Sequence, residues 1–234
     1  MTDQTPVTIH LADYQAYSHL VGSVDLTFHL YPDATRVKAR LTLSPNPARL
    51  GRHPLRLDGE GLTLISIRID GQPVKPKIDA RGLSLAAKVL PAGAFVLETE
   101  VEIAPNANTA LEGLYMSNGM YCTQCEAEGF RKITYYPDRP DVLSRFKVRV
   151  ESDLPVLLSN GNPGATGSGW AEWDDPWPKP AYLFALVAGD LVAQSDRFTT
   201  ASGREVALNI WVRPGDRGRS DYAMDSLIRT MRWD

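Results

Sequence analysis

The stretch YCTQCEAEGF, at 121–130, holds both cysteines of the chain and two glutamates. Cys122 and Cys125 have the C-x-x-C spacing that occurs in metal sites and in redox motifs. Gln124 and Glu126 lie two residues apart and offer an amide oxygen beside a carboxylate. The stretch can therefore hold a metal, exchange disulfides, bind a hydrogen-bond donor, or do none of these.

A zinc site is the first reading to weigh. A structural site takes about four Cys or His ligands, usually as two spaced pairs. This sequence has one C-x-x-C, no second pair and no H-E-x-x-H signature. Its histidines are scattered at His10, His19, His29 and His53. We therefore expect no metal bound by this chain alone.

A redox role for the cysteines is also disfavoured. Thioredoxin-type motifs sit at a helix N-terminus, which lowers the thiol pKa, whereas this segment has no helical period. The neighbouring glutamates would raise a thiol pKa. If the segment is extended, residues three apart face opposite sides, which argues against a disulfide between them. Two small, half-buried side chains are the preferred interpretation.

The same spacing rule gives Gln124 and Glu126 a possible role. In an extended segment, residues two apart share a face, so these oxygens can together accept hydrogen bonds from an ammonium group. An exposed acidic loop, or internal partners for Arg131 and Lys132, is the simpler alternative. Paired carboxylates for sugar hydrolysis rank low, because no other feature suggests a sugar cleft.

The elements around this motif are predicted to be strands. Apolar residues alternate with period two in several segments, which are separated by Pro, Gly and Asn turns: 24–30, 36–43, 95–103 and 146–150. Asp70-Gly71 is a favoured hairpin pair, and a slip of apolar phase at 62–69 suggests a bulge. The pattern predicts a mainly β fold, an antiparallel β-sandwich.

Other segments carry further expectations. Residues 1–20 are expected to form a loosely ordered leader, 104–145 to be irregular, 160–169 to be a hairpin tip, and 181–189 to be a central buried strand. After residue 190, one strand is expected in GREVALNIWV. A helix then follows Ser220 as N-cap and presents the apolar face Ala223, Leu227, Ile228 and Met231. The stripe still runs at the last residue, so we expect a truncated domain start.

Composition limits the possible partners and location. The chain has 234 residues and a net charge of −3, with no basic run. Nucleic acid and anionic membranes are therefore unlikely partners in this reading. No signal peptide or spanning segment is found in the sequence. Two cysteines without an export signal favour a reducing compartment, and we expect a cytoplasmic location.

The segment around this motif resembles a known protein family. NTALEGLYMSNGMYCTQCEAEGFRKITYYPDRPDVLSRF closely resembles the N-terminal domain of the bacterial aminopeptidase N group of gluzincin zinc aminopeptidases. LLSNGN, PKPAYLFALVAGDL and FTTASGREVALNIWV are similar to the same family, in the same order. The resemblance implies a saddle-shaped β domain at 1–193. It also implies that 194–234 is the first strand and helix of a thermolysin-like catalytic domain.

Two site roles follow from the resemblance. Glu126 matches the family's contact to the substrate α-amino group, and Gln124 matches a residue of the first side-chain pocket. The resemblance implies zinc in the full-length enzyme, held by a later H-E-x-x-H helix, and none in this chain. It also implies peptide substrates with a free N-terminus and further domains of the same polypeptide. The full-length enzyme is expected to be monomeric, and this chain alone inactive, with no catalytic residue of its own.

Two other functions remain open at this level. A stand-alone β-sandwich protein-interaction module would need no further domain, and a reading frame that ends at residue 234 would favour it. An epoxide hydrolase on the same scaffold is disfavoured, because those relatives have Gln where this motif has Glu126.

Overall fold

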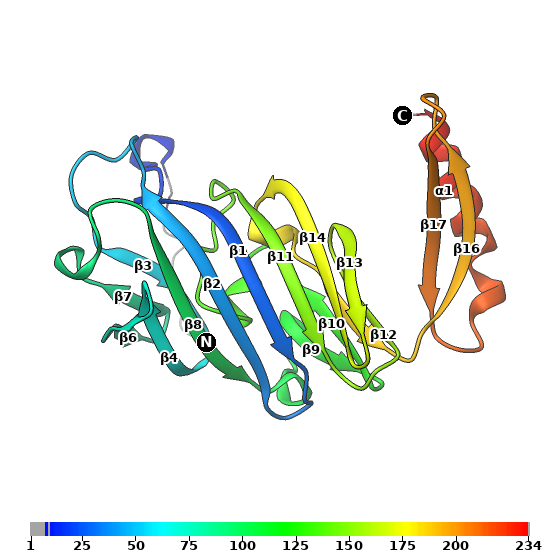
Figure 1. Cartoon of the computed structure of the whole chain (residues 1–234), viewed down its shortest axis with the longest axis horizontal. Coiled ribbons are helices and arrows are strands. Elements are labelled where there is room, and N and C mark those ends of the chain that lie inside the picture. Colours follow the sequence, from blue (N-terminus) through cyan, green and yellow to red (C-terminus); the bar gives the residue numbers. More distant parts are fainter. Residues whose placement is uncertain (1–7, 9, 234) are drawn as a thin grey trace.

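The largest element of the computed structural model, which describes residues 8 and 10–233, is a twisted eight-stranded sheet (Figure 1). Its strand order is β13-β14-β11-β1-β2-β8-β4-β5. The strands are β1 His19–His29, β2 Thr35–Pro45, β4 Thr63–Ile69, β5 Gln72–Pro73, β8 Phe95–Ile103, β11 Ser144–Glu151, β13 Asn162–Gly167 and β14 Trp170–Lys179.

Two smaller sheets provide the second layer. One has the order β12-β15-β10-β9 and the other β3-β7-β6. Their strands are β3 Leu55–Asp58, β6 Lys77–Asp79, β7 Gly82–Leu85, β9 Gly113–Ser117, β10 Met120–Gln124, β12 Val156–Ser159 and β15 Leu186–Gly189. One face of the large sheet and the inner faces of the small sheets bury a continuous apolar core. The predicted mainly β sandwich is confirmed.

The last elements stand apart from the sandwich (Figure 1). Strands β16 (Val192–Thr199) and β17 (Glu205–Val212) form a two-stranded sheet, and helix α1 spans Asp221–Trp233. The predicted boundary between 193 and 194 lies inside β16. Six short 3-10 turns complete the description: η1 Leu11–Asp13, η2 Ala87–Val89, η3 Pro105–Ala107, η4 Phe130–Lys132, η5 Ala181–Leu183 and η6 Arg217–Arg219.

Several local predictions are confirmed. Asp70 and Gly71 have φ of 48° and 77° and join β4 to β5, as a hairpin turn with two positive φ values requires. The phase slip in 62–69 is a bulge, because the β4–β8 register shifts between Leu64 and Ser66. The bounds of β1, β2, β8 and β11 contain or overlap the alternating segments.

Other local predictions are wrong. The sandwich is not wholly antiparallel, because β1 and β11 pair in parallel. Residues 162–167 form strand β13, so only the end of 160–169 is a turn. The run 181–189 begins as η5, and only its last four residues form β15. The irregular middle contains the β9–β10 hairpin. Of the expected leader, 1–7 and 9 lie outside the described residues, while β1 already begins at His19.

The C-terminal elements also differ from expectation. Two strands form where one was expected. The residues of β16 are mostly polar, so this strand shows no alternating apolar pattern in the sequence. On α1 the buried residue is Met224, at 4% exposure, whereas Ala223 is exposed. The Ser220 hydroxyl binds Gln194 and the Arg217 carbonyl, so it does not cap α1. None of the helices in the described part has both the length and the apolar character needed to cross a membrane.

Candidate functional site

The candidate site is a turn that follows strand β10. Gln124 is the last residue of β10, and the chain then turns through 126–129 into η4. A cis peptide joins Glu126 to Ala127. The assumption of an extended segment is therefore wrong beyond Gln124, and strand alternation does not place Glu126.

Gln124 and Glu126 are nevertheless neighbours. The Gln124 amide Nε2 donates to the Glu126 backbone carbonyl at 3.2 Å. Both residues are exposed. Among residues 8 and 10–233, no hydrogen bond or ion pair involves the Glu126 carboxylate. This carboxylate is free to accept a cation from outside the chain.

The other charges of the segment have internal partners. Glu128 pairs with Arg131 at 3.1 Å, and Lys132 pairs with Glu112 at 2.7 Å. Lys132 also approaches Glu60 at 3.6 Å. The alternative of internal partners for Arg131 and Lys132 thus accounts for Glu128 but leaves Glu126 unexplained.

A buried network of polar groups on the protein side of the 126–129 turn holds the turn in place. Asp138 Oδ2 accepts hydrogen bonds from the Arg131 backbone amide at 3.0 Å and from its Nε at 3.2 Å. The Asp138 amide in turn donates to Asp58 Oδ2 at 3.0 Å. Burial raises the pKa of both carboxyl groups, while the Arg131 guanidinium acts in the opposite direction. The YYPDRPD segment therefore braces the turn through Asp138.

Apolar packing fixes the same turn. Cys125 is 2% exposed and Phe130 is fully buried, and the Phe130 ring packs edge-on against Tyr136 and Phe184. Gly129 lies so close to β10 that a Cβ there would come within 2.3 Å of the Gln124 carbonyl oxygen. Glycine is required by this close approach, since a backbone atom cannot move aside cheaply.

Thr123 anchors β10 to its neighbour β15. Its hydroxyl donates to the Leu186 carbonyl at 3.0 Å and accepts from the Leu186 amide at 2.8 Å. The Thr123 side chain thus takes the place of backbone hydrogen bonds between β10 and β15 just before the turn. Gln124 is therefore at the end of a strand that is paired on both edges, with β15 and with β9.

The cysteines are both free, as the sequence predicted. The physical reason differs, because Cys125 lies beyond the end of β10. Burial raises the pKa of Cys125 to about 12 and also raises that of Cys122. Neither thiol is activated for redox chemistry or nucleophilic attack near neutral pH.

Metal donors do not gather in the described part of the chain. Over residues 8 and 10–233, no group of three His, Cys, Asp or Glu side chains could hold a metal ion. These residues therefore do not fit a zinc centre.

Comparison with known proteins decides the family. Residues 20–183 match the Peptidase M1 N-terminal domain. The chain belongs to the peptidase M1 family. Aminopeptidase N of Caulobacter vibrioides is 53% identical over 100% of this chain, which spans only 28% of that relative's length.

Solved peptidase M1 structures share the fold. Legionella pneumophila aminopeptidase A, in complex with aspartic acid, superposes with a TM-score of 0.87 at 34% identity, covering 96% of this chain and 27% of that one. An M1 zinc metallopeptidase from Deinococcus radiodurans, bound to a Tyr-Ser-Ala substrate, superposes at 0.70 with 18% identity, covering 85% and 48%. The second likeness concerns the fold alone.

Proposed function

We propose that this chain is the substrate-recognition part of a peptidase M1 zinc aminopeptidase that removes N-terminal residues from peptides. In this proposal Glu126 binds the substrate α-ammonium group and Gln124 lines the pocket for the first side chain. The observation that carries it is the exposed Glu126 carboxylate, which has no partner among residues 8 and 10–233 and lies on a turn that Asp138 holds in place.

The energetics support a role in selecting chain ends. A hydrogen bond to a charged group contributes roughly 1.5–3 kcal/mol, or about 10- to 150-fold in a binding constant. A true N-terminus carries an α-ammonium group next to the first peptide bond, whereas an internal peptide bond has none beside it and gains nothing from this contact.

Metal chemistry belongs elsewhere in the proposal. In a longer polypeptide, zinc would supply an activated water for attack on the first peptide carbonyl. The residues described here bind and orient the substrate N-terminus, and we assign no metal ligand among them. The chain alone is therefore proposed to lack peptidase activity.

The same proposal covers the domains, partners and location of the protein. Residues 1–193 form the recognition domain, and 194–234 begin the catalytic domain. The partners are peptides with a free N-terminus and further domains of the same polypeptide, in a monomeric cytoplasmic enzyme. The short share of its relatives that this chain spans supports the existence of such further domains.

The test uses the full-length enzyme. Glu126→Gln should lower kcat/KM for aminoacyl arylamides about 10- to 150-fold, by the loss of one charged hydrogen bond. Glu128→Gln is the comparison variant, because Glu128 is also exposed on the same turn but is paired with Arg131. Two results would remove Glu126 from the site: kcat/KM of Glu126→Gln equal to that of the wild type, or an equal loss of kcat/KM in Glu128→Gln.

A further inference from the structure

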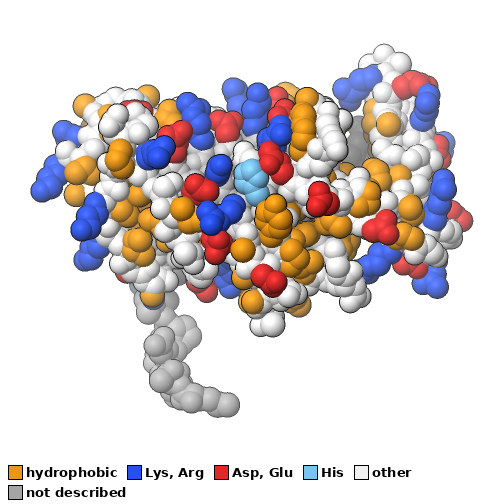
Figure 2. Space-filling model, turned by 60° about the horizontal axis from the view of Figure 1, so that its bottom comes forward, with side chains coloured by type: hydrophobic (Ala, Val, Ile, Leu, Met, Phe, Trp, Pro, Cys, Tyr) orange, Lys and Arg blue, Asp and Glu red, His pale blue; other side chains and the backbone are white. Residues whose placement is uncertain are grey.

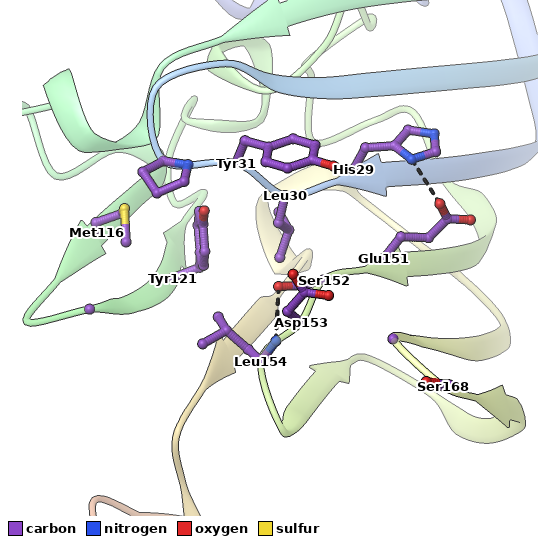
Figure 3. Close-up of a pocket in the computed structure, with 13 residues that line it drawn as sticks. His29, Leu30, Tyr31, Met116, Tyr121, Glu151, Ser152, Asp153, Leu154 and Ser168 are labelled. Carbon is purple, nitrogen blue, oxygen red and sulfur yellow. Dashed lines mark hydrogen bonds and ion pairs between the residues drawn. The ribbon is translucent and has the colours of Figure 1, made fainter.

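A cavity lies at one end of the sandwich, away from the Glu126 turn. It has a volume of about 490 Å³ and is formed by the end of β1, the β9–β10 turn, the β11–β12 connection and the β13–β14 turn (Figure 3). Tyr121, near the start of β10, lines it, whereas Glu126 follows the other end of that strand. The volume suits a ligand of amino-acid size.

The hydroxyl of Tyr121 is a polar group that a ligand in the cavity can reach. Tyr121 is only 3% exposed, and across the described residues its hydroxyl makes no hydrogen bond. In Figure 3 its ring stands between Met116 and Leu30, with the hydroxyl oxygen on the side of the Tyr31 segment. This hydroxyl is not among the fully buried polar atoms that lack a partner, so it opens onto the cavity, where water or a ligand can form a hydrogen bond with it.

The charge around the cavity is acidic. Glu151 and Asp153 line it, and no Lys or Arg does. The His29 Nδ1 lies 2.8 Å from one Glu151 oxygen, and Arg149 binds the other from the sheet face at 2.6 Å. Within the described part, Asp153 has no ion pair. A concave site with surplus carboxylate attracts cations.

Another part of the lining is apolar and aromatic. Leu30, Met116 and Leu154 form the apolar part, and Tyr31 is 64% exposed beside them. Figure 2 shows hydrophobic side chains gathered between scattered charges on the face that carries these strand ends. An alkyl stem would cover the apolar part, while a cationic head reaches the carboxylates and an aromatic face.

We propose that this cavity binds a lysine- or arginine-like group, namely an ammonium or guanidinium on an apolar stem. The Tyr121 hydroxyl and the Asp153 carboxylate accept hydrogen bonds from the cation, and Leu30, Met116 and Leu154 pack against the stem. This site is independent of the proposed peptidase function. The group is carried either by a small free ligand or by a basic side chain elsewhere in a longer polypeptide.

To test this proposal, the 234-residue chain is titrated with agmatine, and binding is measured by calorimetry and by NMR. Agmatine should bind, whereas n-pentanol and glutarate should not. Tyr121→Phe and Asp153→Asn should each weaken agmatine binding about tenfold, the effect of one charged hydrogen bond. Tyr135→Phe is the matched control, because Tyr135 is also 3% exposed but does not line the cavity. Asp190→Asn is the control for an exposed carboxylate.

Two results would overturn the proposal: no agmatine binding to the chain, or binding that neither Tyr121→Phe nor Asp153→Asn weakens. If Tyr121→Phe does not fold, as judged by circular dichroism, the exposed Asp153→Asn decides alone. The full-length enzyme then identifies the source of the cation. Agmatine binding to both proteins indicates a free ligand, and binding to the short chain alone indicates a side chain of the longer polypeptide.

Discussion

Asp138 accepts two hydrogen bonds from Arg131 through one oxygen, from the backbone amide at 3.0 Å and from Nε at 3.2 Å. The Asp138 side chain is 2% exposed and that of Arg131 is 21% exposed. The contact joins the turn that carries Glu126 to the segment that braces it. Both side chains are largely shielded from water. If one of them is removed, water therefore cannot fully take over its hydrogen bonds.

Asp138→Ala should therefore destabilise the fold by about 3 kcal/mol, because the backbone amide and Nε of Arg131 lose their shared acceptor and, among the described residues, only the exposed Glu128 remains as an ion-pair partner. Urea unfolding measures the change. Glu205→Ala is the control, since the Arg197–Glu205 pair is 79% and 65% exposed and should contribute at most about 1 kcal/mol. Similar losses in both variants would mean that burial does not strengthen the Asp138 contact.

Gly129→Ala should destabilise the protein by about 1–3 kcal/mol, the usual effect of overpacking. The added Cβ would meet the Gln124 carbonyl oxygen at 2.3 Å, so the turn or β10 must shift. Gly93→Ala is the control, since a Cβ there meets nothing within 4 Å. Thermal unfolding of the two variants checks this. A stable Gly129→Ala protein would show that the turn is loose.

The two thiols should differ in reactivity. Burial raises the pKa of Cys125 to about 12, and its side chain is shielded, whereas Cys122 is only half-buried. At pH 8, iodoacetamide should modify Cys122 in the native protein, and both cysteines only after unfolding. Mass spectrometry of the labelled peptides gives the order. Faster labelling of Cys125 would contradict its burial.

Cys125 should also make stability depend on alkaline pH. Its folded pKa of about 12 lies above the ordinary thiol value, so unfolding releases a proton once the pH exceeds about 8.5. The stabilising contribution is complete below that pH and is lost as the pH rises toward 12. Cys125→Ala should reduce this slope by up to about 1.4 kcal/mol per pH unit. Denaturant unfolding at pH 9, 10 and 11 measures it, and an unchanged slope would contradict the prediction.

Met224 should hold α1 against the two-stranded sheet. It is the buried residue of the helix, at 4% exposure, so Met224→Ala should cost about 2 kcal/mol locally. Hydrogen exchange should then show faster exchange in α1 and unchanged protection in the eight-stranded sheet. Tyr222→Ala, at a residue 79% exposed, is the control. Equal effects would place the packing face of α1 elsewhere.

The sequence predicted what depends on local patterns. Alternation located β1, β2, β8 and β11, and the Asp70-Gly71 pair located a hairpin, because each signal arises within a few residues. It also singled out Gln124 and Glu126. Their geometry was not predictable, since the chain leaves the strand at Cys125 under the control of packing around Phe130.

The sequence around a residue does not indicate which distant residue it contacts. Asp58 binds the Asp138 amide from 80 residues away, and nothing around Asp58 marks it as a support of the turn. Strand β16 itself was missed, because its residues are mostly polar. On α1 the choice of Ala223 over Met224 was an error of one residue in phase, which only the contact with the neighbouring sheet corrects.

The parallel pairing of β1 with β11 also bears on synthesis at the ribosome. Ser23 pairs with Arg145 in this register, whereas β2 follows β1 directly and can pair with it early. One edge of β1 stays open until β11 has emerged, and open strand edges recruit other chains. A nascent chain that stalls before residue 144 would expose this unpaired edge of β1. We therefore expect chaperones to be needed most before β11 is synthesised.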